Sequence, residues 1–215
     1  FTQLDLEMSF VEEEDILDLI ERMMVQVMRT VRPDATFPQP FPRITYADAM
    51  AQYACDKPDL RYDMKVVDIG DLAAETSFGI FRSALDAGGV VRGIRVPGCA
   101  DYSKHQLTEL TARATAAGAK GLVTVSLIDP SAGEEGIKSV LAKHLTPAQM
   151  STLVRRFGAS NGDLLLIVAD AEAVACKVLD ALRRELAARL KLADPNVFSY
   201  AFVVGFPLFD WTAET

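Results

Sequence analysis

The residues best suited to do chemistry lie at the start of the chain, in the stretch FTQLDLEMSF that spans residues 1–10. Polar and apolar side chains alternate there, so a strand would place Gln3, Asp5 and Glu7 together on one face. Neighbours on such a face lie ~7 Å apart, because a strand rises about 3.3 Å per residue. An amide beside two carboxylates suits an ammonium group or a metal ion better than an anion. The alternative is the plain solvent-facing side of a strand, and the alternation alone does not separate the two.

Other catalytic signatures are missing from the sequence. It contains no Gly-rich phosphate loop, no G-x-S-x-G elbow and no H-E-x-x-H helix. Asp68, Asp71 and Glu75 lie close together but straddle the end of a predicted strand, so they make a poor metal cage. The three cysteines have no paired spacing and the two histidines lie far apart, so we predict neither a metal site nor a disulfide framework.

Charge divides the chain into three parts. Residues 1–69 carry a net charge of −7, residues 70–194 carry +1 and residues 195–215 carry −2. A middle part that differs from both ends is typical of an inserted domain. The total of −8 argues against broad affinity for nucleic acid, so any RNA contact in the middle part requires local clustering of basic residues.

The sequence shows neither a membrane-spanning segment nor a signal peptide. No apolar run approaches the ~20 residues that a membrane-spanning helix requires, and no signal peptide opens the chain. The sequence begins at Phe1 rather than at a methionine. We therefore expect a cytoplasmic section of a longer protein.

The elements that must position the opening strand come from both ends of the chain. A helix is predicted from the acidic residues 12–15 to Arg32, where Pro33 ends it. A proline-rich connector and a short helix over 45–54 follow. The aromatic-rich stretch 198–206 is apolar on both faces, which is typical of a central strand. We predict that it pairs near the opening strand, so that the two chain ends meet.

The middle part alternates short strands with helices. Strands are predicted at 66–69, 90–96, 122–128 and 164–168, and helices at 78–85 and after the capping residues Ser103, Thr146 and Asp170. The predicted class is α+β, with a mostly antiparallel sheet, helices on one face and a β-β-α repeat suggested by the likeness of the two halves. Basic residues crowd the end of the last helix, where they complement its dipole; they are Arg183, Arg184, Arg189 and Lys191.

Several stretches resemble one family in the same order. FTQLDLEMSFV is similar to the end of motif 2 in the bacterial-type aspartyl-tRNA synthetases, which are class II ligases. FPRITYADAMAQYACDKPDLRYDM resembles the segment that leads into their insertion, and FSYAFVVGFPLFDW resembles the strand that returns from it. VVDIGDLAAETSFGIFRSALDAGGVVRGIRVPG and NGDLLLIVADAEAV resemble the GAD domain inserted between them. The resemblance implies a partial class II catalytic sheet with helices in 1–69 and 195–215, and a GAD domain in 70–194.

The resemblance also implies a reaction, namely activation of aspartate by ATP and its transfer to tRNA. By the family pattern, Asp5 receives the ammonium group of aspartate, and Gln3 and Glu7 lie beside it. Lys57 and Arg61 are candidates for contact with tRNA phosphate, or else they pair with the aspartates around them. The parent enzyme is expected to use ATP and Mg²⁺ and to be a homodimer, whereas this chain is expected to bind neither cofactor and to be a monomer.

Parts of the family pattern do not occur in this sequence. The arginine of motif 2, the His-His-Pro segment, motif 3 and the anticodon-binding barrel are missing, so we expect that this chain by itself does not aminoacylate. The alternative function is a non-catalytic, tRNA-proximal or structural module, since GAD domains also occur in the archaeal glutamyl-tRNA amidotransferase. The sequence leaves open whether the parent charges only aspartate tRNA or also asparagine tRNA.

Overall fold

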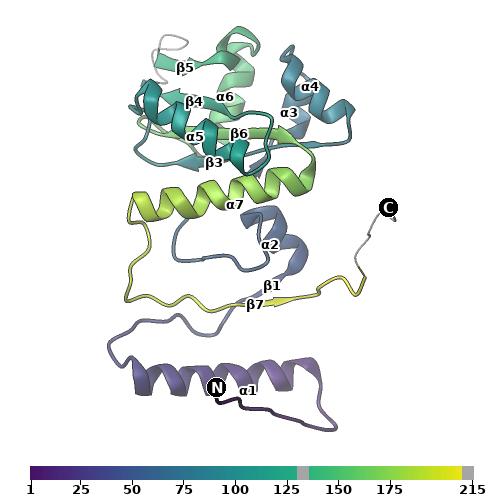
Figure 1. The fold of residues 1–215 in the computed structure, drawn as a ribbon, viewed down its shortest axis with the longest axis vertical. Helices are drawn as coiled ribbons and strands as arrows, with labels where there is room; N and C mark the ends of the chain where they lie inside the picture. The colour runs from purple at the N-terminus through teal and green to yellow at the C-terminus, as the bar shows by residue number, and fades with distance from the viewer. Residues whose placement is uncertain (130–135, 210–215) are drawn as a thin grey trace.

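The computed structural model describes residues 1–129 and 136–209 (Figure 1). A small lower part comes from both ends of the chain. Its elements are α1 (Glu13–Val31), β1 (Arg43–Thr45), α2 (Tyr46–Tyr53) and β7 (Phe202–Val204). The larger upper part is continuous in sequence. Its elements are β2 (Val66–Asp68), α3 (Gly70–Ala74), α4 (Gly79–Asp86), β3 (Val90–Val96), α5 (Lys104–Ala116), β4 (Val123–Leu127), β5 (Ile137–Ser139), the 3-10 helix η2 (Val140–Lys143), α6 (Pro147–Arg156), β6 (Leu164–Asp170) and α7 (Glu172–Arg189).

The upper part is built on a five-stranded sheet in the order β2-β3-β6-β4-β5. Each neighbouring pair in this sheet is antiparallel. The central pair, β3 and β6, is matched over seven positions, from Val90 opposite Asp170 to Val96 opposite Leu164. The α+β class with a mostly antiparallel sheet is therefore confirmed.

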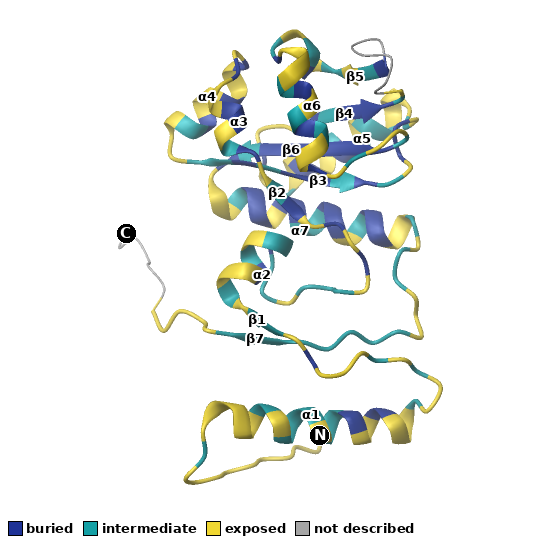
Figure 2. Cartoon of the chain, turned by 180° about the vertical axis from the view of Figure 1, so that it is seen from behind, coloured by how far each residue is buried: buried dark blue, intermediate teal, exposed yellow. Residues whose placement is uncertain are grey.

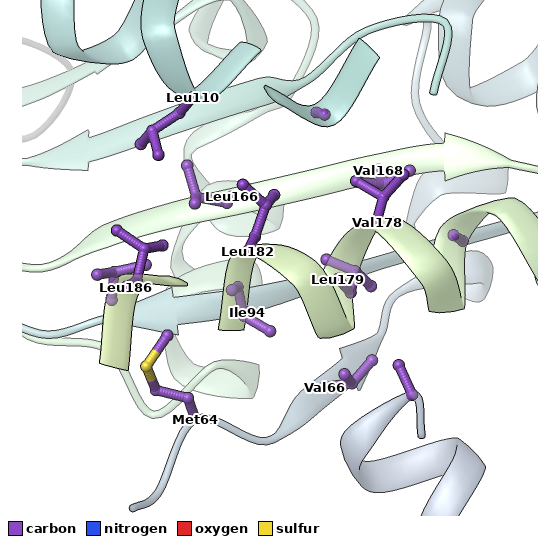
Figure 3. Packing of buried hydrophobic residues seen from close by; sticks show 14 of the residues in the cluster. Met64, Val66, Ile94, Leu110, Leu166, Val168, Val178, Leu179, Leu182 and Leu186 are labelled. Atoms are coloured by element: carbon purple, nitrogen blue, oxygen red, sulfur yellow. The ribbon is translucent and has the colours of Figure 1, made fainter. Parts of the chain in front are cut away.

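Helices cover both faces of this sheet, whereas the sequence predicted them on one face. Leu164, Leu166 and Val168 of β6 pack into a core with α5 and α7 (Figure 3). Leu165 and Ile167 face the opposite way, into a second core with α3, α4 and α6. The reason lies in β6 itself, because a strand that is apolar at successive positions needs cover on both sides. The two-layer expectation is therefore corrected to three layers.

The upper part contains the internal repeat that the sequence suggested, with a different composition. One copy runs β2-α4-β3-α5, with α3 inserted, and the other runs β4-α6-β6-α7, with β5 and η2 inserted. The two copies meet at the β3–β6 pair in the centre of the sheet. Each unit is therefore β-α-β-α rather than β-β-α. Helices α5 and α6 begin at the predicted capping boxes, where Ser103 and Thr146 each accept a hydrogen bond from the backbone N–H of a glutamine three residues later.

The helices of the lower part confirm the sequence prediction, but its strands differ from it. Residues 1–10 form no strand, and Leu4, Leu6 and Met8 are exposed (Figure 2). Strand β7 pairs instead with β1, in parallel, with Arg43 opposite Phe202, and it is only half-buried. The predicted pairing of the chain ends is therefore wrong, as is the central position of β7. A strand persists only beside a hydrogen-bonding neighbour, and the described part of the chain offers none to residues 1–10.

Helix α7 lies between the five-stranded sheet and α2, so it joins the two parts (Figures 1 and 2). The chain enters the upper part through residues 59–65 and leaves it through residues 190–197. Within the described ranges, none of the helices has the length and apolar character needed to cross a membrane.

Candidate functional site

The predicted substrate residues lie in the exposed N-terminal segment. Gln3, Asp5 and Glu7 are each exposed and outside regular structure. Over residues 1–129 and 136–209, no side-chain hydrogen bond or ion pair engages Asp5 or Glu7. The structure therefore leaves these carboxylates available but does not gather them into a pocket.

A groove of about 1090 Å³ lies between the N-terminal segment, α1 and the connector before β1. Met8 and Val11 line it on one side, and Gln39 and Pro40 line it on another. Helix α1 contributes both acidic and basic side chains to its wall, which are Asp15, Asp18, Glu21, Arg22 and Arg29. The groove is thus mixed in charge, and none of the three predicted substrate residues lines it.

Arg43 on β1 fixes α1 to the two-stranded sheet. Its guanidinium donates to the carboxylates of Glu14, Asp18 and Glu21, each at 3.0 Å. The hydrogen bond to Glu14 is the main cause that raises the pKa of Arg43. The same guanidinium lies 5.2 Å from the centre of the Phe202 ring on β7. One arginine therefore connects three elements, and the acidic first half of α1 serves this contact as well as the helix dipole.

The predicted RNA-contact residues lie in the turn before the chain enters the upper part. Arg61 is held by Asp59, with Nε–Oδ1 at 2.9 Å and Nη2–Oδ2 at 2.6 Å. This bidentate pair raises the pKa of Arg61 and lowers that of Asp59. Lys57 is exposed, and its ammonium has no carboxylate partner among the residues that the structure describes. Of the two bases, Lys57 is thus the one whose charge is free, and contact of either with tRNA remains a prediction.

Arg183 on α7 has a buried position that the sequence analysis did not predict. Its side chain is among the largest that are fully buried, at 1% exposure. Nε donates to the carbonyl of Met64 at 3.1 Å, and Nη2 donates to the carbonyls of Asp59 and Tyr62 at 2.7 and 3.3 Å. The rings of Tyr62 and Tyr53 lie 4.4 and 5.0 Å from the guanidinium carbon.

The position of Arg183 corrects its interpretation as a surface charge that complements the helix end. It lies four residues after Leu179 and three before Leu186, both of which are buried. This spacing places Arg183 on the buried face of α7, and it was the signal available in the sequence. The side chain ties residues 59–64 to α7 and so fixes the lower part against the upper part.

Two of the three carboxylates considered for a metal, those of Asp68 and Asp71, are engaged by arginines. Asp68 accepts a hydrogen bond from Arg92 at 2.9 Å, and Asp71 accepts two from Arg156. No group of three potential metal ligands occurs within the described ranges. The three cysteines are free, and burial raises the pKa of the Cys99 thiol. The ion pairs of Asp68 and Asp71 thus connect β2 with β3 and α3 with α6.

Comparison with known proteins finds a family match for the upper part and sequence similarity for the chain as a whole. Residues 81–179 match the GAD domain family. Over its full length the chain is 47% identical to the aspartate–tRNA(Asp/Asn) ligase of Dehalococcoides mccartyi, 46% to that of Moorella thermoacetica and 40% to that of Bacillus cytotoxicus. This chain is similar over its full length to bacterial aspartate–tRNA(Asp/Asn) ligases and contains a GAD domain. It spans only 37%, 35% and 36% of those three proteins, respectively.

The match to the GAD family extends over most of the upper part. It begins in α4 and ends halfway along α7, so it includes the central β3–β6 pair. Strand β2 and the second half of α7 lie outside the match but belong to the same sheet and core. The similarity to the aspartate–tRNA ligases also covers α1, β1, α2 and β7, which lie outside the GAD match.

Proposed function

We propose that this chain works as a section of an aspartate–tRNA ligase, an enzyme that activates aspartate with ATP and transfers it to tRNA. The observation that carries the proposal is the extent of the similarity. Residues 1–80 and 180–215 lie outside the GAD match, yet the ligases align with the chain over its full length. A free-standing GAD module would not need those flanks, so the proposal favours a ligase over such a module.

The distribution of exposed apolar side chains supports the same proposal. Among the described residues, all but two of the large exposed hydrophobics lie outside residues 70–194. Leu6 and Met8 on the N-terminal segment, Val31 on α1 and Phe206 after β7 are examples, with 50%, 48%, 65% and 53% exposure. Exposed apolar surface of this kind marks regions that pack against further protein. We propose that in the complete ligase the flanks pack against the rest of a class II catalytic domain.

The proposed division of the chain follows from these two arguments. Residues 1–69 and 195–215 would belong to the catalytic domain, and residues 70–194 would form the GAD insertion. Strand β2 lies before residue 70 but pairs with β3, so the sheet of the insertion extends back to Val66. We expect the complete ligase to be a cytoplasmic homodimer and this chain to be a monomer.

The proposed role of the N-terminal segment is to hold aspartate. Asp5 would receive the ammonium group, and Gln3 and Glu7 would lie beside it once residues 1–10 gain strand neighbours. The free carboxylates of Asp5 and Glu7 fit a cation, which supports this role. When bound, Mg²⁺ would help ATP by neutralising the triphosphate charge. The described residues include no set of three metal ligands, so no step through Mg²⁺ is assigned to this chain.

The test is aspartate-dependent ATP–pyrophosphate exchange by the complete ligase that contains this sequence. Asp5→Asn should lower kcat/KM for aspartate at least ~30-fold, since truncating a partner of a buried charge pair costs about 2–5 kcal/mol. Asp86→Asn is the matched control, because Asp86 is an exposed acid at the end of α4, far in sequence from the proposed site.

The possible outcomes distinguish a failure of the role proposed for Asp5 from a failure of the proposed ligase function. Full exchange activity in Asp5→Asn would refute the role of Asp5. A complete ligase without aspartate-dependent exchange would refute the function itself. The 215-residue chain alone should show no exchange above background, and clear turnover by it would contradict the proposed division of labour.

A further inference from the structure

A small basic pocket lies where the chain enters the upper part. Its volume is about 330 Å³, and its wall comes from the entry segment 63–67, from β3 and from the end of α6. Four of the side chains that line it are basic, and they are Lys65, Arg95, Arg155 and Arg156. Asp63 is the acid among its lining residues, and the buried ring of Phe157 also contributes to the wall.

Two of the four bases are held in place by carboxylates. Arg95 donates to Asp163, with Nη1–Oδ2 at 3.3 Å, and the side chain of Asp163 is only 6% exposed. Arg156 binds Asp71 on α3 through both terminal nitrogens. These pairs orient the two guanidinium groups at the edge of the pocket. They also neutralise part of its charge, so the capacity to bind an added anion rests on the other two bases.

Lys65 and Arg155 supply that capacity. Both are exposed, and neither has a carboxylate partner in the part of the chain that the structure describes. The ammonium of Lys65 lies 6.0 Å from the centre of the Tyr53 ring, so its side chain extends toward the end of α2. An ammonium and a guanidinium at one concave site can together donate several charge-assisted hydrogen bonds to the oxygens of a phosphate.

We propose that this pocket binds a backbone phosphate of tRNA and so forms an RNA contact of the GAD insertion. The inference rests on the proposed function, which provides tRNA as a partner. The chain has a net charge of −8, so a polyanion can approach it only where bases cluster locally. The pocket is such a cluster, whereas Arg61 in the nearby turn is already occupied by Asp59.

The pocket can be tested with the 215-residue chain and a fluorescently labelled aspartate tRNA transcript. Binding is measured by anisotropy at several KCl concentrations. For Lys65→Gln/Arg155→Gln, the slope of log affinity against log salt should fall by about 1 relative to the unmodified chain, because the pocket binds one phosphate and each phosphate contact contributes about one unit. The matched control is Lys104→Gln/Lys177→Gln, which removes the same charge from two exposed lysines that do not line the pocket.

The control variant should keep the salt slope of the unmodified chain. Equal losses in the two double variants would overturn the proposal, since bulk charge would then explain binding. An unchanged slope in the pocket variant, or no tRNA binding by the unmodified chain, would also overturn it. Phosphorus NMR with inorganic phosphate addresses the other source of the same chemistry. Saturable binding of inorganic phosphate that the pocket variant abolishes, without any change in tRNA affinity, would assign the pocket to a small anion instead.

Two further measurements keep the outcomes distinct. Urea unfolding of both double variants should give the midpoint of the unmodified chain, which excludes misfolding as the cause of weaker binding. Aspartate-dependent ATP–pyrophosphate exchange does not require tRNA. Normal exchange by the complete ligase together with unchanged tRNA binding in the pocket variant would therefore refute the pocket and leave the proposed function intact.

Discussion

Replacing Arg183 with methionine should destabilise the chain more than any other single change of a basic residue on α7. Methionine fills similar space but has no donors, so the three carbonyls that Arg183 serves would lose their partner. They belong to Asp59, Tyr62 and Met64. The guanidinium would also no longer lie between the rings of Tyr53 and Tyr62.

The size of the effect follows from burial. Each buried acceptor left without a donor costs about 1–3 kcal/mol, and a cation–π contact away from water contributes about 2 kcal/mol. Removing the charge offsets part of this loss, since a buried guanidinium carries its own cost of desolvation. We expect a net loss of about 3 kcal/mol in the free energy of unfolding, or roughly 150-fold in the equilibrium constant. The loss of unfolding free energy in Arg183→Lys should lie between zero and the loss in Arg183→Met. The ammonium of lysine can still donate hydrogen bonds, but it lacks the planar fork that reaches three carbonyls.

The neighbouring residue provides the control. Arg184 is 67% exposed in its side chain and pairs with Asp180 one turn earlier on the same helix. Such a pair contributes only about 0.3–0.5 kcal/mol, so Arg184→Met should change stability little.

Urea unfolding followed by circular dichroism measures both variants. Hydrogen exchange of the amides in residues 59–65 should accelerate in Arg183→Met alone. Equal unfolding midpoints for the two methionine variants would refute the role of Arg183 in holding residues 59–64 against α7.

Two further predictions concern the upper part. Hydrogen bonds from Arg156 lower the pKa of Asp71 to about 2, so its contribution to stability is complete above its ordinary pKa of 3.8 and is lost as the pH falls through about 2. Because the Asp71 side chain is 68% exposed, Asp71→Asn should cost less than about 1 kcal/mol at pH 7; an NMR titration midpoint near 4 would contradict the pairing. Gly93→Ala should cost about 1–3 kcal/mol, since the added carbon would lie 2.5 Å from the Leu166 carbonyl oxygen and 3.0 Å from the Phe157 ring. The carbon added in Gly79→Ala would meet no atom within 4 Å, so this control should leave the urea midpoint unchanged. Equal midpoints for the two alanine variants would argue against the close packing of Gly93 against β6 and Phe157.

Local signals in the sequence predicted the upper part well. The capping boxes at Ser103 and Thr146 place the starts of α5 and α6, because a hydroxyl that accepts from the third helical N–H acts over one turn. The apolar run of β6 predicts a buried strand for a similar reason. What it could not show was the number of helical layers, since burial on two faces depends on elements that lie far away in sequence.

The lower part was predicted less well, for a physical reason. Alternation in residues 1–10 describes which faces a strand would have, but a strand also requires a neighbour to accept and donate its hydrogen bonds. The described residues do not provide that neighbour, so the exposed Leu4, Leu6 and Met8 face solvent. The roles assigned to Gln3 and Asp5 therefore depend on contacts that this chain does not make by itself.

The buried cation of Arg183 helps to join the two parts, and in the proposed ligase this would affect how the GAD part influences catalysis. Arg183 binds the entry segment to α7, while Arg43 binds α1 to the sheet formed by β1 and β7. Helix α7 also packs on the central strands of the GAD sheet. In the proposed ligase, a displacement of the GAD part, such as one caused by a phosphate bound beside Lys65, would be transmitted to α2 through residues 59–65. We predict that tRNA alters KM for aspartate in the complete proposed ligase through this contact, and that Arg183→Met removes the effect of tRNA while exchange without tRNA persists. Unaltered coupling in that variant would mean that the coupling does not depend on Arg183.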